Sequence, residues 1–317
     1  MRDGSVMIKN QPARVSVVIT AYNHERFINE TLDSVLSQDA GPLEIIVVDD
    51  CSRDNTLAIA QSYAGRGVRV ITKPNGGPSS ALNAGIACAT GDIIILLSGD
   101  DVLLPDSIAP RCEALALSGA DVVSAVPRWI DESGRVLTSN EHPHVFAAPE
   151  KLKPVDMFSR LFFHGNFICA PSVAITRRCL EAVGAFDETL WQLQDFEYWL
   201  RVSAKGFGFY FLQQPLIKYR MHSRNLSTSN PERLRQENEL VLANAAQFLS
   251  APDLQELLFG EGFREIDLGL DATHLAHLLT IRHSYWTVRS IGRWELSKVL
   301  KDSHAYAQLV EKFTLGL

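Results

Sequence analysis

Short apolar runs alternate with amphipathic segments along the first hundred residues. The runs are rich in β-branched residues, which is typical of strands buried on both faces of a sheet. They cover residues 15–19, 44–48, 68–72 and 93–97. The segments between them, residues 27–36, 55–64 and 79–89, predict helices from the spacing of their apolar positions or from their many small residues. This alternation predicts an α/β fold with a mostly parallel sheet and helices on both faces.

Polar side chains follow three of the four predicted strands directly. They are Thr20, Tyr22, Asp49, Asp50, Asp100 and Asp101. Ligands bind beyond the carboxyl ends of the strands in such sheets, so we expect these residues to share one site. An aspartate at a strand end often only caps the next turn. Four acids at one edge repel one another, however, unless donors or a divalent cation offset them, which favours Mg²⁺ or Mn²⁺ bridging a nucleotide diphosphate.

The alternation of strands and helices weakens beyond residue 120. Residues 121–127 predict one more strand, and the stretch that follows, up to residue 154, is interpreted as an insertion near the substrate. Residues 229–317 show helical periodicity and almost no strand signal. We therefore expect an α/β domain over 1–228 and a helical C-terminal region over 229–317.

Composition and charge exclude several classes of protein. The 317 residues are 46% hydrophobic with a mean hydropathy of zero, which predicts an ordinary soluble globule. A formal charge of −7 gives no general attraction to nucleic acid, so no nucleic-acid partner is expected. The five cysteines are scattered and no apolar run reaches 18 residues, which predicts neither a disulfide framework nor a membrane span or signal peptide. The expected location is the cytoplasm.

Two common nucleotide-binding motifs are absent from the sequence. There is no GxxxxGK[ST] loop, and no GxGxxG follows the first predicted strand. That strand ends instead in Thr-Ala-Tyr-Asn, which offers a hydroxyl, an aromatic face and an amide. Such side chains can stack on a base and hydrogen-bond to it without enclosing its phosphates.

Five segments between residues 14 and 228 resemble, in order, the motifs of family 2 glycosyltransferases. They are VSVVITAYNHERFINETLDSVLSQ, EIIVVDDCSRDNT, NGGPSSALNAGIACATGDIIILLSGDD, GAFDETLWQLQDFEYWLRVSAKG and YRMHSRNLS. The resemblance implies the Rossmann-like GT-A fold and an inverting transfer from a nucleoside-diphosphate sugar, most simply a UDP-sugar. It also implies a divalent metal, Mn²⁺ or Mg²⁺, and an acceptor hydroxyl on a glycan or lipid-linked saccharide in cell-surface polysaccharide biosynthesis.

The resemblance assigns roles to the residues of the donor site. Thr20 and Tyr22 match residues that contact the base, and Asp50 matches the aspartate that accepts a hydrogen bond from the base ring. Asp100 and Asp101 match the region that holds ribose and metal, and which of them is the metal ligand stays open. His222 matches a position that completes the metal shell or touches the diphosphate.

Three motif positions depart from the commoner family residues. Ser98 replaces an aspartate and Leu82 replaces an arginine, so Lys73, Arg220 and Arg224 are expected to help neutralise the diphosphate. In Gln194-Asp195-Phe196-Glu197 the first acid is replaced, but Asp195, which matches the general base, is retained. These departures leave open an alternative, a sugar-nucleotide-binding module with impaired catalysis.

The C-terminal region holds one basic and aromatic segment, residues 281–301. It contains five Lys or Arg, one acid, Tyr285, Trp286 and Trp294. Such a segment can lie on an anionic membrane surface, here the inner face, as a peripheral contact. Packing against the rest of the protein is the commoner fate of an amphipathic helix, and we favour it. The sequence does not determine an oligomeric state.

Overall fold

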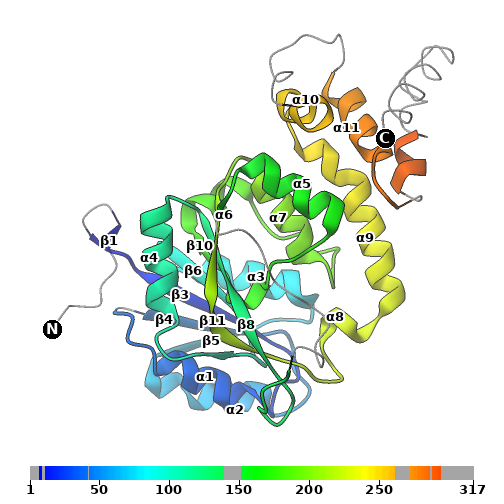
Figure 1. Cartoon of the computed structure of the whole chain (residues 1–317). Coiled ribbons are helices and arrows are strands. Elements are labelled where there is room, and N and C mark those ends of the chain that lie inside the picture. The colour runs from blue at the N-terminus through cyan, green and yellow to red at the C-terminus, as the bar shows by residue number, and fades with distance from the viewer. Residues whose placement is uncertain are drawn as a thin grey trace, which may run out of the picture. The chain divides into compact units, whose positions relative to one another are not determined.

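The computed structural model describes residues 7–8, 11–41, 43–138, 151–260, 271–285 and 288–293 (Figure 1). The chain divides into two compact units. The first comprises Met1–Lys153, Phe167–Asp195 and Phe207–Ser229, and the second comprises Pro154–Asn166, Phe196–Gly206 and Asn230–Leu317. Two segments that precede residue 229 are therefore grouped with the C-terminal helices. The expected division at residue 228 placed both of these segments in the first domain.

A nine-stranded mixed sheet forms the centre of the first unit, with the order β5-β4-β3-β6-β10-β8-β11-β7 and β9 paired to β11. Its parallel part is β5 (Val68–Thr72), β4 (Leu43–Asp49), β3 (Val15–Ala21) and β6 (Ile93–Ser98). These are the four strands that the apolar runs predict. The α/β fold is therefore confirmed, with a parallel half that matches the prediction inside a sheet that is mixed as a whole.

The other strands extend the sheet beyond β6. They are β7 (Val102–Leu103), β8 (Val122–Ile130), β9 (Lys151–Leu152), β10 (Ala174–Thr176) and β11 (Phe209–Arg220). Strand β10 runs antiparallel between β6 and β8, and β11 pairs parallel with β8 through a register shift around Pro215. A separate two-stranded sheet joins β1 (Met7–Ile8) to β2 (Gln11–Pro12).

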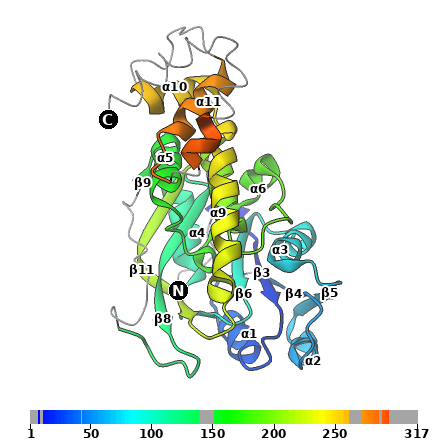
Figure 2. The same cartoon turned by 90° about the vertical axis from the view of Figure 1, so that its right-hand side faces the viewer.

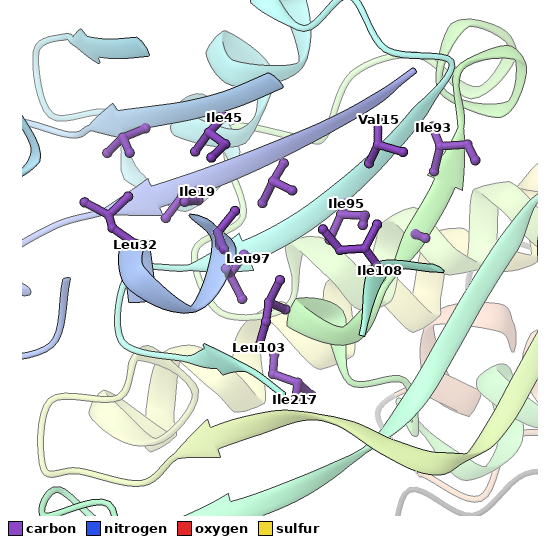
Figure 3. Close-up of a cluster of buried hydrophobic side chains, with 14 of the residues drawn as sticks. Val15, Ile19, Leu32, Ile45, Ile93, Ile95, Leu97, Leu103, Ile108 and Ile217 are labelled. Carbon is purple, nitrogen blue, oxygen red and sulfur yellow. The ribbon is translucent and has the colours of Figure 1, made fainter. Parts of the chain in front are cut away.

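Helices cover both faces of the sheet, as the alternating pattern predicts. They are α1 (Ile28–Leu36), α2 (Thr56–Ser62), α3 (Gly77–Cys88), α4 (Ile108–Ser118) and α6 (Arg177–Val183). Odd-numbered residues of β3, such as Ile19, share one apolar cluster with Leu32 of α1 and Ile108 of α4 (Figure 3). Val18 points to the opposite face, where its Cγ1 would lie 2.3 Å from a Cβ placed on Gly85 of α3.

The second unit is helical in its described part. It contains α5 (Pro154–His164), most of α7 (Gln194–Ala204), α9 (Pro231–Ala245), α10 (Ala251–Phe259) and α11 (Ala272–Ile281) (Figure 2). The short helix α8 (Leu226–Ser229) ends the first unit. Of the basic aromatic segment 281–301, Ile281, His283 and Val288 are buried and Tyr285 and Ile291 are exposed, while Trp286 and residues 294–301 lie outside the described residues. None of the described helices combines the length and the apolar character that a membrane span requires.

Candidate active site

The carboxyl ends of β3, β4 and β6 meet at one edge of the sheet. Thr20 pairs in register with Val48 of β4 and Ser98 of β6. Beyond the strands, the Asp50 N–H donates to Ala21 O at 2.9 Å, and the Gly99 N–H donates to Thr20 O at 2.9 Å. The polar residues that the sequence places after these strands therefore lie together. Tyr22 is 39% exposed here, so its ring is accessible to a ligand.

The Asp50 carboxylate binds the turn that leads into α3. Its Oδ1 accepts hydrogen bonds from Lys73 Nζ at 2.8 Å and from the Gly76 N–H at 3.0 Å, and its Oδ2 accepts from the Gly77 N–H at 2.8 Å. Gly77 has a φ of +84°, a conformation that favours glycine. Asp49, by contrast, is fully buried and accepts from the Ser52 N–H at 3.1 Å. The two neighbouring acids thus hold two different turns.

Asp100 faces two histidines at the end of β6. Its Oδ2 lies 2.9 Å from His222 Nε2 and 3.8 Å from His24 Nε2. Since the Arg224 N–H donates to His222 Nδ1 at 3.2 Å, Nε2 carries the proton and donates to the carboxylate. The other oxygen, Oδ1, is buried and has no hydrogen-bond partner in the described structure. Burial opposes ionisation of Asp100, but His24 and the hydrogen bond from His222 outweigh it and lower the pKa of this carboxyl below its usual range.

Asp101, the next residue in the sequence, lies in a different environment. Its carboxyl is only 2% exposed, and Oδ1 accepts from the Arg220 N–H of β11 at 2.9 Å. Burial, reinforced by the nearby charge of Asp100, raises the pKa of Asp101 well above its ordinary value. The two acids therefore differ in their surroundings: Asp100 faces two histidines, whereas Asp101 accepts a backbone N–H of β11.

The three cations expected near a diphosphate have different surroundings. The Arg220 guanidinium is buried; Nε donates to Asp100 O at 2.9 Å, and Nη2 forms an ion pair with Glu30. Lys73 is paired with Asp50 as described above, whereas Arg224 is exposed. Arg220 and Lys73 are thus already engaged with the protein, and Arg224 alone has an exposed side chain next to His222.

The loop that leads to Asp195 is hydrogen-bonded to α3. Asn83 of α3 donates from Nδ2 to Phe186 O at 2.9 Å and accepts the Phe186 N–H at 2.9 Å, and Ser79 Oγ donates to Leu190 O at 3.1 Å. Asp195 itself is half-buried at the second position of α7. The sequence did not predict this role of Asn83. Asn83 directly follows Leu82, which stands where the family often has an arginine.

A second connection joins this loop to the segment that carries His222. Gln192 Nε2 donates to Leu226 O at 2.6 Å, and the His222 ring stacks on Phe27 with ring centroids 5.1 Å apart.

Sequence reasoning also passed over His24. Its signal is its position, because it directly follows the Thr-Ala-Tyr-Asn end of the first strand.

The sequence matches the family described as Glycosyl transferase family 2 over residues 16–184, more than half of the chain. An uncharacterized glycosyltransferase of Rickettsia prowazekii is 34% identical over 230 residues, which are 71% of this chain and 70% of that protein. The chain belongs to glycosyl transferase family 2. Another relative of this glycosyltransferase, the succinoglycan biosynthesis protein ExoO of Rhizobium meliloti, is 31% identical over 73% of this chain and 67% of its own length.

Solved structures share the fold of this glycosyltransferase. Residues 1–349 of TarS from S. aureus, solved with UDP-GlcNAc, align with a TM-score of 0.64 at 19% identity over 93% of this chain and 92% of that one. The mannosyltransferase PcManGT from Pyrobaculum calidifontis, solved with GDP-Man and Mn²⁺, aligns with a TM-score of 0.54 at 19% identity over 95% and 79%. These likenesses support the GT-A fold.

The residues around Asp100 fit a metal that is shared with a substrate. Among the described residues, no group of three or more His, Cys, Asp or Glu side chains is arranged as a metal site. Asp100 nevertheless offers a buried carboxylate oxygen without a partner, and the His222 imidazole lies beside it. A divalent cation bound to substrate phosphates usually takes only one or two protein ligands. These residues therefore fit a metal that would be shared with a substrate diphosphate.

Proposed function

We propose that this glycosyltransferase transfers a sugar from a nucleoside-diphosphate sugar, most simply a UDP-sugar, to a hydroxyl of a glycan or lipid-linked saccharide with inversion at the anomeric carbon. The observation that carries the proposal is the Asp100 carboxylate, with one oxygen unpartnered and His222 at 2.9 Å, at the sheet edge where the Tyr22 ring is exposed. This edge offers a base-stacking face together with ligands for a metal-bound diphosphate.

Each residue of the site has a part in binding or proton transfer. Thr20 and Tyr22 contact the base, and Asp50 accepts a hydrogen bond from the base ring. Asp100 would hold Mn²⁺ or Mg²⁺, and His222 would join it after its proton moves from Nε2 to Nδ1. The bound metal would neutralise charge on the leaving diphosphate. Arg224 is the exposed cation that assists it.

Asp195 is the general base in this proposal. An acceptor hydroxyl is a poor nucleophile at neutral pH, so a carboxylate within hydrogen-bond reach must take its proton as the oxygen attacks the anomeric carbon. The new bond forms opposite the bond to the departing diphosphate, and the configuration inverts. The contacts of Asn83 and Ser79 with the preceding loop limit the movement of the segment that leads to this carboxylate.

The names of similar proteins support the proposed substrates. TarS was solved with UDP-GlcNAc and PcManGT with GDP-Man, which supports a nucleotide-sugar donor. ExoO is named for succinoglycan biosynthesis, which supports a role in making a cell-surface polysaccharide. We place the reaction in the cytoplasm, and we favour packing of residues 281–301 against the protein over a peripheral membrane contact, because Ile281, His283 and Val288 are buried.

Turnover separates the proposed enzyme from a sugar-nucleotide-binding module with impaired catalysis. The protein is incubated with a panel of nucleotide sugars, Mn²⁺ and a mixture of saccharide acceptors, and release of free nucleoside diphosphate is measured. We expect many turnovers with at least one donor, loss of activity in excess EDTA, and recovery with Mn²⁺. Binding of nucleotide sugars without any turnover would instead favour the impaired module.

The Asp195→Asn variant is the matched control for this assay. Asn has the size of Asp and removes only a favourable charge from the first turn of α7, worth about 0.3–1 kcal/mol, so folding and donor affinity should stay close to those of the wild type. Since the amide cannot take a proton, kcat should fall by about 10²–10⁴. Gln194→Glu, which restores the commoner family residue, should be tolerated. Wild-type kcat in Asp195→Asn would remove this residue from the mechanism.

A further inference from the structure

Lys73 carries an ammonium group to the end of the neighbouring strand. It directly follows β5, and its Nζ lies 2.8 Å from Asp50 Oδ1 and 2.7 Å from Pro74 O. The two side chains of the ion pair are 19% and 5% exposed. A Cβ at Gly76 would lie 2.9 Å from this Nζ, so the glycine provides the space that the ammonium occupies. The ion pair is therefore built into the turn between β5 and α3.

Both members of the ion pair keep hydrogen-bonding capacity. An ammonium has three N–H donors, and Asp50 and Pro74 accept two of them. No described residue accepts the third. A carboxylate has about four acceptor sites. Oδ2 of Asp50 accepts from the Gly77 N–H at 2.8 Å, and its contact with the Gly76 N–H is longer, at 3.3 Å. The pair thus offers a donor next to an acceptor.

This combination matches one edge of a keto base. Uracil presents an N3–H donor beside the O4 acceptor, and guanine presents N1–H beside O6. Cytosine and adenine present the reverse pattern, an unprotonated ring nitrogen beside an amino group. The lone pair of that ring nitrogen would face the Asp50 carboxylate, and the amino group would face the Lys73 ammonium. Such mismatches at desolvated polar groups are strongly disfavoured.

We propose that Asp50 and Lys73 together select the donor's base, and that they favour a keto base, such as uracil, over its amino counterpart. Asp50 accepts the ring N–H and Lys73 donates to the adjacent carbonyl oxygen, while Tyr22, 39% exposed on the neighbouring strand end, covers the ring face. This inference rests on the proposed nucleotide-sugar donor and adds Lys73 as a specificity-determining residue. It gives Lys73 a different role from the diphosphate contact that the sequence suggests.

The test is a set of dissociation constants measured by isothermal titration calorimetry with UDP and CDP in the presence of Mn²⁺. The two nucleotides differ only at N3 and at the substituent on C4. Wild-type protein should bind UDP at least about tenfold more tightly than CDP. In Lys73→Met the UDP affinity should fall by about tenfold or more and the CDP affinity should change little, so that the preference for UDP shrinks by that factor and only the part due to Asp50 remains. GDP and ADP form a second pair for the same comparison.

A contact with the diphosphate, or a purely structural ion pair, predicts a different result. Either role would make Lys73→Met weaken UDP and CDP by the same factor, which would overturn the proposal. Lys151→Met removes the same charge from an exposed lysine on β9 and should leave all four affinities unchanged. Melting temperatures without ligand verify that each variant is folded. Binding of no nucleotide by the wild type would instead refute the proposed donor itself, and this inference with it.

Discussion

Asp100 and Asp101 are adjacent in sequence but differ in chemistry, and burial alone does not explain the difference. Both are buried, with 7% and 2% exposure. Asp100 lies next to His24 and His222, which favour its charged form, whereas Asp101 lies next to the charge of Asp100, which disfavours it. A charged carboxylate binds a cation more strongly than a protonated one. We therefore propose Asp100, and not Asp101, as the metal ligand.

Substitution of each aspartate by asparagine tests this assignment. Asp100→Asn should lower the affinity for Mn²⁺, measured by electron paramagnetic resonance titration in the presence of UDP, by about tenfold or more, because a ligand is lost. Asp101→Asn should change it by less than about threefold, since an amide oxygen keeps the hydrogen bond from the Arg220 N–H. The opposite order of the two effects would reverse the assignment.

The sequence could identify the acids but not their separate roles. Two doublets at strand ends indicate where a diphosphate site lies, because the periodicity already places the strand ends together. The contact between Asp100 and His222 joins residues 122 positions apart, and the tautomer of His222 depends on the Arg224 N–H. Neither follows from local pattern. The contact of His24 with Asp100 was missed for the same reason.

At the scale of elements, sequence pattern predicts the parallel half of the sheet and misses much of the rest. Strands β3, β4 and β6 are mostly apolar and buried on both faces, so their signal is strong. Strand β11 contains Gln213, Gln214 and Pro215, which are unfavourable in a strand, and its register with β8 shifts at that point. Long-range pairing with β8 stabilises it, and no local signal reports that pairing.

Helix α3 packs so closely on the sheet that one of its positions requires glycine. A Cβ at Gly85 would lie 2.3 Å from Val18 Cγ1 and 3.1 Å from Val48 Cγ2. Gly85→Ala should therefore lower the free energy of unfolding by about 1–3 kcal/mol, measured by urea denaturation, because overpacking forces side chains or backbone to shift. Gly65→Ala is the matched control, since nothing lies within 4 Å of its Cβ. Equal stability of the two variants would show that α3 is not held at this distance.

For the whole molecule, the boundary between the two units falls at Asp195. The first unit ends a segment at Asp195, and the second begins its next one at Phe196, within the same helix α7. The proposed base thus stands at the boundary in the chain between the α/β unit and the helical unit. Sequence pattern did not predict this division, because α5 and most of α7 precede the C-terminal region in the sequence.

We propose a single inverting displacement in which Asp100, His222 and Asp195 take part. Proton nuclear magnetic resonance of the first turnovers with an α-linked nucleotide sugar tests this mechanism, before mutarotation changes the anomeric ratio of any hydrolysed sugar. The transferred sugar should appear first as the β anomer, whether a saccharide or water accepts it. First appearance of the α anomer would contradict the mechanism, since retention requires either a second displacement or attack from the side of the leaving group.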